Sequence, residues 1–471
     1  MPTTTQARFT TGSTMRHVIV MTATGSIGLM AIFIVDALNL LYISMLGKQQ
    51  LAAAIGYAGT LMFFTVSVSI GLTIAASALV SRALGKGDRD EAARLAGAAL
   101  LTIFAATVLV VALTWPFIHE LIGLLGASGE TRDIAAGFTQ IVLPSLPIMG
   151  LGMGLAGILR GAGDAKRAMY VTLFSGAATA IFDPLFIFGF DLGVTGAAIS
   201  TVLTRFVMLG VGLYAAVIVH QLVKRPQPGD LRKAIPMFLA IGIPAVLTQV
   251  ATPVGNAFVT AEIARFGDDA VAGWAVIGRI VPVSFGAIFA LSGAVGPILG
   301  QNYGAQKFGR IVQTMRDSLL VATIYVVAVW LALALLRQPI ADLFGMDGEA
   351  RLLIYFFCLF AAGSFLFNGA LFVANAAFNN LGYPVMSTVF NWGRATLGVL
   401  PFVWVGSALY GAQGVLAGWG LGAVFFGVAS VLVCFRVIAR LERDNPPDDF
   451  LPEAPPSAQS PFTTGKAATS G

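Results

Sequence analysis

Long apolar segments recur along almost the whole chain, and short polar stretches separate them. Each apolar run reaches or exceeds the roughly 20 residues that an α-helix needs to cross the hydrocarbon core of a bilayer. Cutting the chain at its charged residues and at its Pro and Gly punctuation predicts about twelve helices. The predicted spans are 18–45, 52–82, 92–118, 134–159, 168–190, 194–222, 235–265, 270–300, 312–336, 350–379, 384–408 and 412–436. The pattern predicts an all-α polytopic membrane protein.

The composition supports this class and excludes most others. Of the 471 residues, 57% are hydrophobic and only 11% are charged, a balance that soluble globular proteins do not show. The net charge of +5 would suit nucleic-acid binding if the basic residues shared one surface, but they are distributed over alternate short loops. Neither a nucleophile with its base nor a metal-binding cluster is visible. We therefore predict neither an enzyme nor a nucleic-acid partner, and no cofactor.

The basic residues mark one side of the predicted membrane. Its loops contain Arg82, Lys86, Arg89, Arg94, Arg160, Lys166, Arg167, Lys224, Arg225, Arg232, Lys233, Lys307, Arg310 and Arg316. By the positive-inside rule, these loops and both chain termini are cytoplasmic. Residues 1–17 are then a cytoplasmic segment, and residues 441–471 are predicted to be a disordered cytoplasmic tail because they are rich in Pro, Ser and Asp. We expect a multi-pass protein of the bacterial inner membrane.

The two halves of the chain resemble each other. Segments that start at positions 46, 78, 159 and 193 match segments that start at positions 266, 297, 378 and 411, so the spacing between matched segments is almost constant. Four collinear matches predict an internal duplication. The duplicated units are two six-helix bundles, residues 18–222 and 235–440, joined by a cytoplasmic linker over residues 223–234. Such repeats commonly enclose a cavity for alternating access between them.

Two aspartates lie deep inside apolar helices of the first half. Asp36, Asp183 and the hydroxyl residue Thr201 fall at a similar depth when helical rise is counted from the helix ends. A charge at the centre of a membrane helix costs about 2.5 to 3.5 kcal/mol, so it usually has a function. Two carboxylates can exchange a proton or, with other oxygens, hold a dehydrated Na⁺. Pro184 also frees a backbone carbonyl about one turn earlier.

Arginines in the apolar helices allow other interpretations. Arg205, one turn from Thr201, could form a static ion pair with Asp36 or Asp183. Three further polar residues are candidates for cavity lining or charge pairing: Arg279, Arg394 and Asn375. Arg265 has no obvious acidic partner, and we expect Glu262, near the end of its helix, to be solvated.

Several segments, taken together and in order, resemble the multidrug and toxic compound extrusion (MATE) transporters. They are VDALNLLYISMLGKQQLAA, SRALGKGDRDEAARLAG, LRGAGDAKRA, DPLFIFGFDLGVTGAAIST and GQNYGAQKFGR. The resemblance covers the chain except its C-terminal tail. It implies two bundles in a V shape, cation-coupled export, and a proton or Na⁺ site formed by Asp36, Asp183 and Thr201. Thr179 stands where the family often has an asparagine, and the first helix lacks the family's common proline.

We therefore predict a secondary active exporter of organic, often cationic or amphipathic compounds, driven by H⁺ or Na⁺ and acting as a monomer. The second-half helices lack the carboxylates of the NorM-like branch, so the chain resembles the DinF-like branch. If Na⁺ drives transport, Asp36 and Asp183 are its metal ligands. The nearest alternative is a flippase for a lipid-linked or amphipathic metabolite, for which Arg205, Arg279 and Arg394 would favour an anionic headgroup. A passive channel would instead carry ohmic current without counter-transport.

Overall fold

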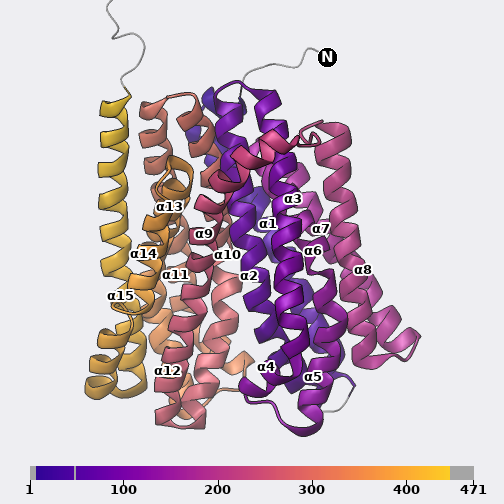
Figure 1. Ribbon diagram of the computed structural model, residues 1–471. Helices are drawn as coiled ribbons and strands as arrows, with labels where there is room; N and C mark the ends of the chain where they lie inside the picture. The colour runs from indigo at the N-terminus through magenta and orange to yellow at the C-terminus, as the bar shows by residue number, and fades with distance from the viewer. Residues whose placement is uncertain (1–6, 47–48, 446–471) are drawn as a thin grey trace, which may run out of the picture.

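The computed structural model describes residues 7–46 and 49–445, and within these ranges the chain forms helices and no strand. The helices stand side by side, with most helices of the first half on one side of the molecule and most of the second half on the other (Figure 1). The first half contains α1 (Thr14–Ser44), α2 (Gln49–Gly85), α3 (Arg89–Thr114), α4 (Ile118–Leu124), α5 (Gly129–Val142), α6 (Leu146–Gly161), α7 (Ala165–Pro184) and α8 (Gly193–Leu213). The second half contains α9 (Pro228–Ile263), α10 (Asp268–Gly304), α11 (Phe308–Leu343), α12 (Gly348–Leu359), α13 (Phe365–Leu381), α14 (Pro384–Ala395) and α15 (Leu400–Asp444).

Within the described ranges, these helices make twelve membrane crossings. Eleven stretches are long and apolar enough to span a bilayer, and the last of them, Pro384–Asp444, has 61 residues. At about 1.5 Å per residue, this stretch is far longer than one crossing needs. Its backbone leaves the helical region at Tyr410 and at Gly411, which has a φ of 61°, so the stretch turns back and crosses twice. The predicted all-α fold with twelve transmembrane helices is confirmed.

Some predicted boundaries differ from those of the structure. Helix α1 begins at Thr14, inside the predicted N-terminal segment, and α9 begins at Pro228, inside the predicted linker. Helix α15 continues to Asp444, so the start of the predicted tail is helical. The rest of that tail, residues 446–471, lies outside the described residues.

The helix boundaries repeat with the spacing found in the sequence. Helices α2 and α10 begin at Gln49 and Asp268 and end at Gly85 and Gly304, so both ends are shifted by the same number of residues. The start of α11 follows the start of α3 by this same shift, and so does the start of α14 relative to α7. The duplicated sequence therefore produces duplicated helices.

The basic loops lie at the end of the molecule that contains residue 7 and the C-terminal end of α15 (Figure 1). We call this the basic end, and the other the opposite end. Short Gly-containing turns start two helices at the basic end. Gly87 and Gly163 have φ values of 83° and 85°, which glycine adopts without strain. Asp88 and Asp164 follow and accept a hydrogen bond from the backbone N–H three residues later, as N-cap residues do. These turns place charged residues at the helix starts.

A close contact between α2 and α10 joins the two halves at the basic end. A Cβ on Gly85 would lie 2.1 Å from the carbonyl oxygen of Gln301, and a Cβ on Gly304 would lie 2.1 Å from the carbonyl oxygen of Arg82. The two contacts are equivalent under the internal repeat, because Gly85 and Gly304 end the two corresponding helices. Only glycine allows the two backbones to approach so closely, so each half supplies the same small residue to a pseudo-symmetric contact.

The N-terminal segment lies across this contact. The backbone N–H of Phe9 donates to Oε1 of Gln301 at 2.9 Å, and the Phe9 side chain is 1% exposed. Arg310 donates to the carbonyl oxygens of Phe9 and Gly12 in the same segment. On the other side, Nη1 of Arg8 donates to the carbonyl oxygen of Gly163, in the first half, at 2.8 Å. The segment therefore links the first half to the second.

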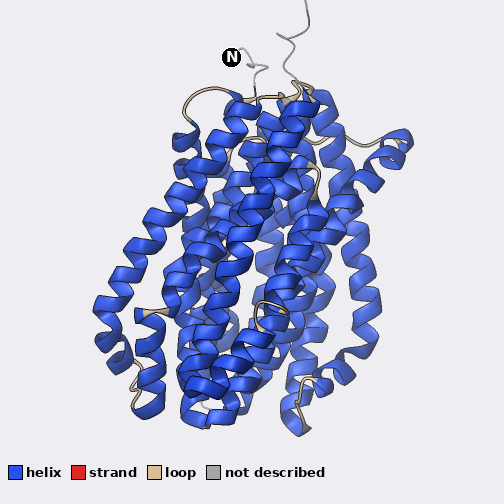
Figure 2. Cartoon of the chain, turned by 90° about the vertical axis from the view of Figure 1, so that its left-hand side faces the viewer, coloured by secondary structure: helices blue, strands red, loops and turns tan. Residues whose placement is uncertain are grey.

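Hydrogen bonds close the molecule at the basic end, while α2 also packs closely against α9 nearer its middle, where a Cβ on Gly71 would lie 2.5 Å from the backbone nitrogen of Val246. Across residues 7–46 and 49–445, every hydrogen bond that joins α2 or the N-terminal segment to α10, α11 or α13 lies at the basic end, including the bonds from Arg82 to the carbonyl oxygens of Asn379 and Asn380 at 2.7 and 2.8 Å. Further along, Gly25 and Met30 of α1 meet Ala290 and Gly286 of α10 through apolar contacts. Figure 2 shows the same helices from the side.

The α2–α10 contact predicts a sharp difference between two glycine substitutions on one helix. We expect Gly85→Ala to lower the unfolding midpoint of the purified protein, because the added methyl group overlaps a backbone carbonyl; overpacking of this kind costs about 1 to 3 kcal/mol. Gly56→Ala is the matched control, since nothing lies within 4 Å of its added Cβ. Thermal unfolding in detergent measures both variants. Equal midpoints for the two would contradict the role of the contact.

Candidate functional site

Asp183 is a buried carboxylate near the end of α7. Its side chain is only 1% exposed, and it precedes Pro184, after which the chain continues as the π-helical turn Leu185–Gly189. Proline has no backbone N–H to donate, and π-helical turns are frequent at functional sites. The local sequence FDPLFIFG thus places a carboxylate where the regular backbone hydrogen bonding of the helix is interrupted.

Asn39 links this carboxylate to α1. Its Nδ2 donates to Oδ2 of Asp183 at 2.9 Å. Helices α1 and α7 run in parallel here, because Gly28 meets Thr172 and Val35 meets Gly176. The pairs 28–172 and 39–183 have the same offset of 144 residues. The Asn39–Asp183 hydrogen bond therefore continues the packing contact between α1 and α7.

The backbone position of Asp36 lies on the inner side of α1. The exposed residues Ile27 and Ile34 precede it by nine and two residues, which at about 100° per residue places position 36 on the opposite side of the helix. The contacts on either side of it, Gly28–Thr172 and Asn39–Asp183, set this position level with the turn of α7 that contains Thr179 and Asp183. The side chain of Asp36 lies outside the described residues.

Hydroxyl residues of α7 and α8 occur close to Asp183 in the chain or in space: Thr179 is one turn earlier on α7, and Ser200, next to Thr201 on α8, is beside the carboxylate. Thr201 is half-buried and donates to the carbonyl oxygen of Ala197 at 2.9 Å, and Thr179 donates to the carbonyl oxygen of Ser175 at 3.1 Å. Beside Thr201, the buried hydroxyl of Ser200 lies next to the Asp183 carboxylate; apart from this contact, neither Oγ of Ser200 nor Oδ1 of Asp183 has a hydrogen-bond partner in the described structure. Both buried oxygens therefore keep hydrogen-bonding capacity.

This arrangement can bind a small cation. A carboxylate oxygen, a serine hydroxyl and two threonine hydroxyls are hard oxygen donors, which suit alkali and alkaline-earth cations; the same carboxylate can take up a proton. The site contains a single described carboxylate, and among the described residues no group of three His, Cys, Asp or Glu residues could hold a metal ion. The donor set therefore fits H⁺ or Na⁺ better than a transition metal.

Arg205 does not pair with Asp183. Its Nη1 donates to the carbonyl oxygen of Val142 at 3.0 Å and to Oγ of Ser145 at 2.8 Å, and the residue is 7% exposed. Both acceptors belong to the junction of α5 and α6, where the helix is interrupted by a 3-10 turn. The alternative of a static Arg205–Asp183 bridge is therefore wrong, because the guanidinium satisfies carbonyl and hydroxyl oxygens freed by that turn.

The other polar candidates lie in the second half, away from the α7 carboxylate. Arg279 is exposed on α10. Arg394 is 6% exposed, and its Nη2 donates to Oγ1 of Thr252 at 3.1 Å. Asn375 is also 6% exposed, and its backbone carbonyl oxygen accepts from Ser387 at 3.2 Å. The structure does not assemble these residues with Asp183 into one site.

Glu262 is buried rather than solvated. It is 7% exposed, and its Oε1 accepts from Arg265 at 2.8 Å and from Ser407 at 2.7 Å. The expectation of a solvated Glu262, and of an Arg265 without an acidic partner, is wrong for one reason: the two residues are three positions apart on the same helix face, a spacing that favours ion pairs.

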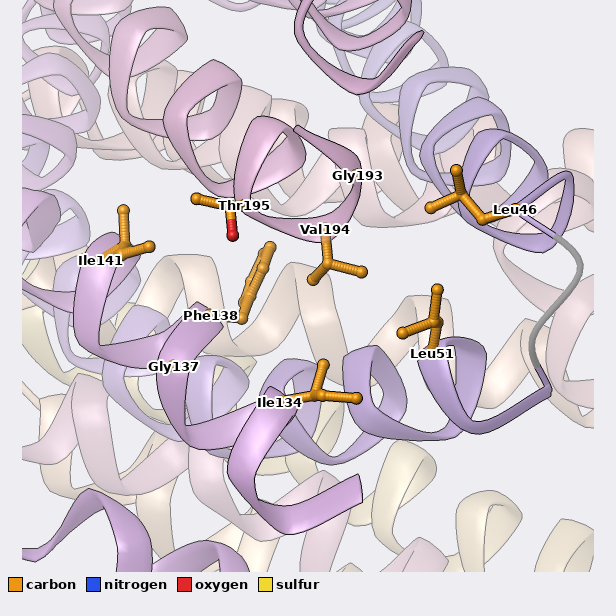
Figure 3. A pocket seen from close by; sticks show the side chains of 9 residues that line it. All are labelled: Leu46, Leu51, Ile134, Gly137, Phe138, Ile141, Gly193, Val194 and Thr195. Atoms are coloured by element: carbon orange, nitrogen blue, oxygen red, sulfur yellow. The ribbon is translucent and has the colours of Figure 1, made fainter. Parts of the chain in front are cut away.

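A cavity of about 420 Å³ opens near the opposite end, beside the first half. Figure 3 shows its lining, in which the side chains of Ile134, Phe138, Leu51 and Val194 approach one another from α5, α2 and α8. Thr195 supplies a hydroxyl, and no lining residue is charged. The cavity offers apolar contact but no counter-charge, so it does not extend the cation site.

Sequence reasoning missed two residues of the site, Asn39 and Ser200. A signal for Asn39 was present, since it follows Asp36 by three residues in an apolar helix and so shares roughly its face. Ser200 adjoins the predicted Thr201. Helical rise gives the depth of a residue in the membrane but not the side of the helix on which it lies, so it does not distinguish Ser200 from Thr201.

Curated relatives align along most of the chain. A protein named FAD transporter from Shewanella oneidensis is 28% identical over 417 residues, which cover 87% of this chain and 92% of that protein. Multidrug export protein MepA from Staphylococcus aureus is 24% identical over 427 residues, 89% of this chain and 93% of that protein. The two names describe different cargoes.

Solved structures show the same fold. The Vibrio cholerae MATE transporter VcmN in the bent form superposes with a TM-score of 0.85 at 24% identity, covering 91% of this chain and 98% of that one. A multidrug resistance MATE family transporter in an outward-facing conformation gives a TM-score of 0.88 at 21% identity, covering 94% and 100%. At these identities the likeness concerns the fold alone.

The sequence profile of one family matches the chain twice, once in each half, over residues 23–185 and 244–405. The two matched regions include most of α1 to α7 and of α9 to α14 and together exceed half of the chain. The members of this family are transporters and not enzymes, which confirms the predicted class. From its duplicated helices and this double match, the chain belongs to the MatE family of membrane transporters.

Proposed function

We propose that this protein exports small organic, often cationic or amphipathic compounds in exchange for H⁺ or Na⁺ by alternating access. The coupling cation binds in the first half at Asp36 and Asp183, with Asn39, Ser200, Thr201 and Thr179 around them. A coupling site confined to the first half agrees with the predicted likeness to the DinF-like branch. The cargo occupies the space between the halves.

The observation that carries this proposal is the buried Asp183, held by Asn39 across the α1–α7 contact. A carboxylate at this depth is costly, and its described polar neighbours are the Asn39 amide and the Ser200 hydroxyl, with no cation. A static structural role would favour a full set of partners. Oδ1 of Asp183 and Oγ of Ser200 instead leave hydrogen-bonding capacity for a cation.

The proposed orientation places the basic end in the cytoplasm, following the positive-inside rule. The halves are bonded to each other at that end, so this arrangement corresponds to the state that is closed to the cytoplasm. Export then requires a second state in which the α2–α10 contact and the N-terminal segment separate and the opposite end closes.

Coupling requires that cation and cargo prefer different states. Because Asn39 belongs to α1 and Asp183 to α7, a cation that competes for Asp183 oxygens changes the bond between these helices. Helix α1 also contacts α10 of the second half. A change at Asp183 can thus reach the surface between the halves through one helix, without a separate relay.

A second candidate cargo is an anionic amphipathic compound. The FAD transporter relative transports an anionic dinucleotide by its name, and Arg394 is a buried cation whose described polar contact is a threonine hydroxyl. This reading stays close to the flippase alternative, since both need a cationic surface for a phosphate-bearing cargo.

Neutralising the coupling carboxylates should abolish cation-driven efflux. We expect Asp36→Asn and Asp183→Asn each to remove the response of transport to the driving gradient, because an amide cannot take up a proton and binds Na⁺ far more weakly than a carboxylate. The measurement is efflux of a fluorescent organic cation from reconstituted vesicles, with H⁺ and Na⁺ gradients imposed separately. The gradient that drives the wild type identifies the coupling ion.

Asp347→Asn is the matched control, because its side chain is 89% exposed. It should transport like the wild type. Undiminished gradient-driven efflux by the double variant of Asp36 and Asp183 would refute the proposed site.

Competition by charged compounds distinguishes a cationic from an anionic cargo. We expect organic cations to compete with the fluorescent cation, and FAD to compete poorly, with little change in Arg394→Gln. If FAD competes strongly in the wild type and loses this effect at least tenfold in Arg394→Gln, an anionic cargo binds at Arg394 and the restriction to cationic cargo is wrong.

The orientation predicts which surfaces react from outside the cell. A cysteine placed at Leu124, 83% exposed at the opposite end, should react with a membrane-impermeant maleimide in intact cells. A cysteine at Arg225, exposed at the basic end, should react only after permeabilisation. The native Cys358 and Cys434 are buried, so background is low. The reverse labelling pattern would invert the proposed topology.

A further inference from the structure

A second cavity, of about 310 Å³, lies at the basic end where the N-terminal segment meets both halves. Its size falls at the lower end of small-molecule sites, about 300 to 1,000 Å³. It lies beside Ala7 and Arg8 and between the starts of α3 and α7 and the end of α10. Its lining consists of Ala7, Arg8, Leu84, Gly87, Arg89, Ala162, Asp164, Arg167, His220, Leu222 and Gln301.

Four groups in this lining are cationic or can become so: Arg8, Arg89, Arg167 and His220. The single carboxylate is Asp164, whose Oδ2 accepts from Nη1 of Arg167 at 2.5 Å and contacts Nε2 of His220 at 2.7 Å. Burial alone would raise the pKa of Asp164, but hydrogen bonds from His220 and from the backbone and side chain of Arg167 hold it well below its usual value. The carboxylate therefore stays ionised and engaged.

The two remaining arginines have no carboxylate partner among the described residues. Arg8 donates to the carbonyl oxygen of Gly163 at 2.8 Å, and Arg89 to that of His220 at 2.5 Å. A guanidinium has five N–H donors, so both retain several. The carboxylates beside Arg89 are used elsewhere: Asp88 caps α3, and Asp90 accepts from Lys224 at 2.7 Å.

These observations define a cavity with surplus positive charge and unused planar N–H donors. Guanidinium groups bind phosphate oxygens through paired hydrogen bonds, and basic pockets between transmembrane helices at the cytoplasmic side bind lipid headgroups. We propose that this cavity binds a phosphate group, and that the bound phosphate bridges Arg8 of the N-terminal segment to Arg89 of α3. The group belongs either to an anionic lipid headgroup or to a soluble phosphate compound.

Such a bridge strengthens the closure of the basic end. Arg8 belongs to the segment whose next residue, Phe9, is bound to Gln301 of the second half, while Arg89 belongs to the first half. A ligand that binds only when these elements are together stabilises that state by its binding free energy. The phosphate is thus an effector at the surface between the halves, separate from the cation site and independent of the identity of the cargo.

The first experiment measures the unfolding midpoint of the full-length protein in an uncharged detergent, with pyrophosphate or chloride at constant ionic strength. The second measures it in nanodiscs of phosphatidylcholine, with or without phosphatidylglycerol. We expect a saturable rise of the midpoint, together with slower trypsin cleavage after Arg8, in one of the two arms. A rise with pyrophosphate identifies a soluble phosphate ligand, and a rise only with phosphatidylglycerol identifies a lipid.

The decisive variant is the double substitution Arg8→Gln/Arg89→Gln, which removes two guanidinium groups without leaving a carboxylate unpaired. The matched control, Arg225→Gln/Arg232→Gln, removes two exposed arginines that do not line the cavity. The double cavity variant should lose the rise of the midpoint, and the control should keep it. Equal responses in the two variants, or no rise in either arm for the wild type, would overturn the proposal. The readout involves no gradient or cargo, so it is independent of the proposed transport cycle.

Discussion

The close approach of α2 and α10 is the contact on which the rest of the structure depends. At Gly85 and Gly304 each helix brings its backbone against a carbonyl oxygen of the other, and the lack of side chains at these positions allows it. With the helices this close, Arg82 reaches the carbonyl oxygens at the end of α13, and Gln301 reaches both Gly161 of α6 and Phe9. The basic cavity exists because the same contact brings α3, α7 and α10 together around the N-terminal segment.

The hydrogen-bond partner of each buried polar group indicates which helices that group holds together. Water is absent there, so a polar side chain must find its partner within the protein. Arg205 finds two oxygens at an irregular turn of its own half, and Glu262 finds Arg265 and Ser407 within the second half. Each of these contacts stays within one half of the molecule. The Asp183–Asn39 bond instead joins α7 to α1, and α1 also contacts α10 of the second half. In the proposed cycle, a movement of the halves relative to each other would therefore act on this bond.

Much of the fold was predictable from the sequence, because apolar length fixes the crossings and the repeat relates the halves. The depth of Asp183 was predictable for the same reason, since helical rise is constant. What could not be predicted was the direction of each side chain around its helix. Arg205 and Asp183 are at comparable depth but do not meet, while Asn39 and Ser200 gained importance only from neighbours on other helices. The guanidinium partners of the basic cavity depend likewise on how loops distant in sequence are folded together.

The two halves differ at the positions of the proposed cation site. The positions equivalent to Asp36, Asn39 and Asp183 under the shift that relates α2 to α10 are Gly255, Phe258 and Phe402. Gly255 packs against Ala395, and the backbone of Phe402 lies against Gly418. After the turn at Gly411, the chain packs back against residues 398–406. An added Cβ on Gly414, Gly418 or Gly422 would overlap a carbonyl oxygen of that segment. At the three equivalent positions the second half therefore has glycine or phenylalanine where the first half has carboxylates and an amide. Under the proposed function, the duplicated α2–α10 contact is where the halves separate, and the α1–α7 contact, which the second half does not repeat in its residues, is where the coupling cation binds.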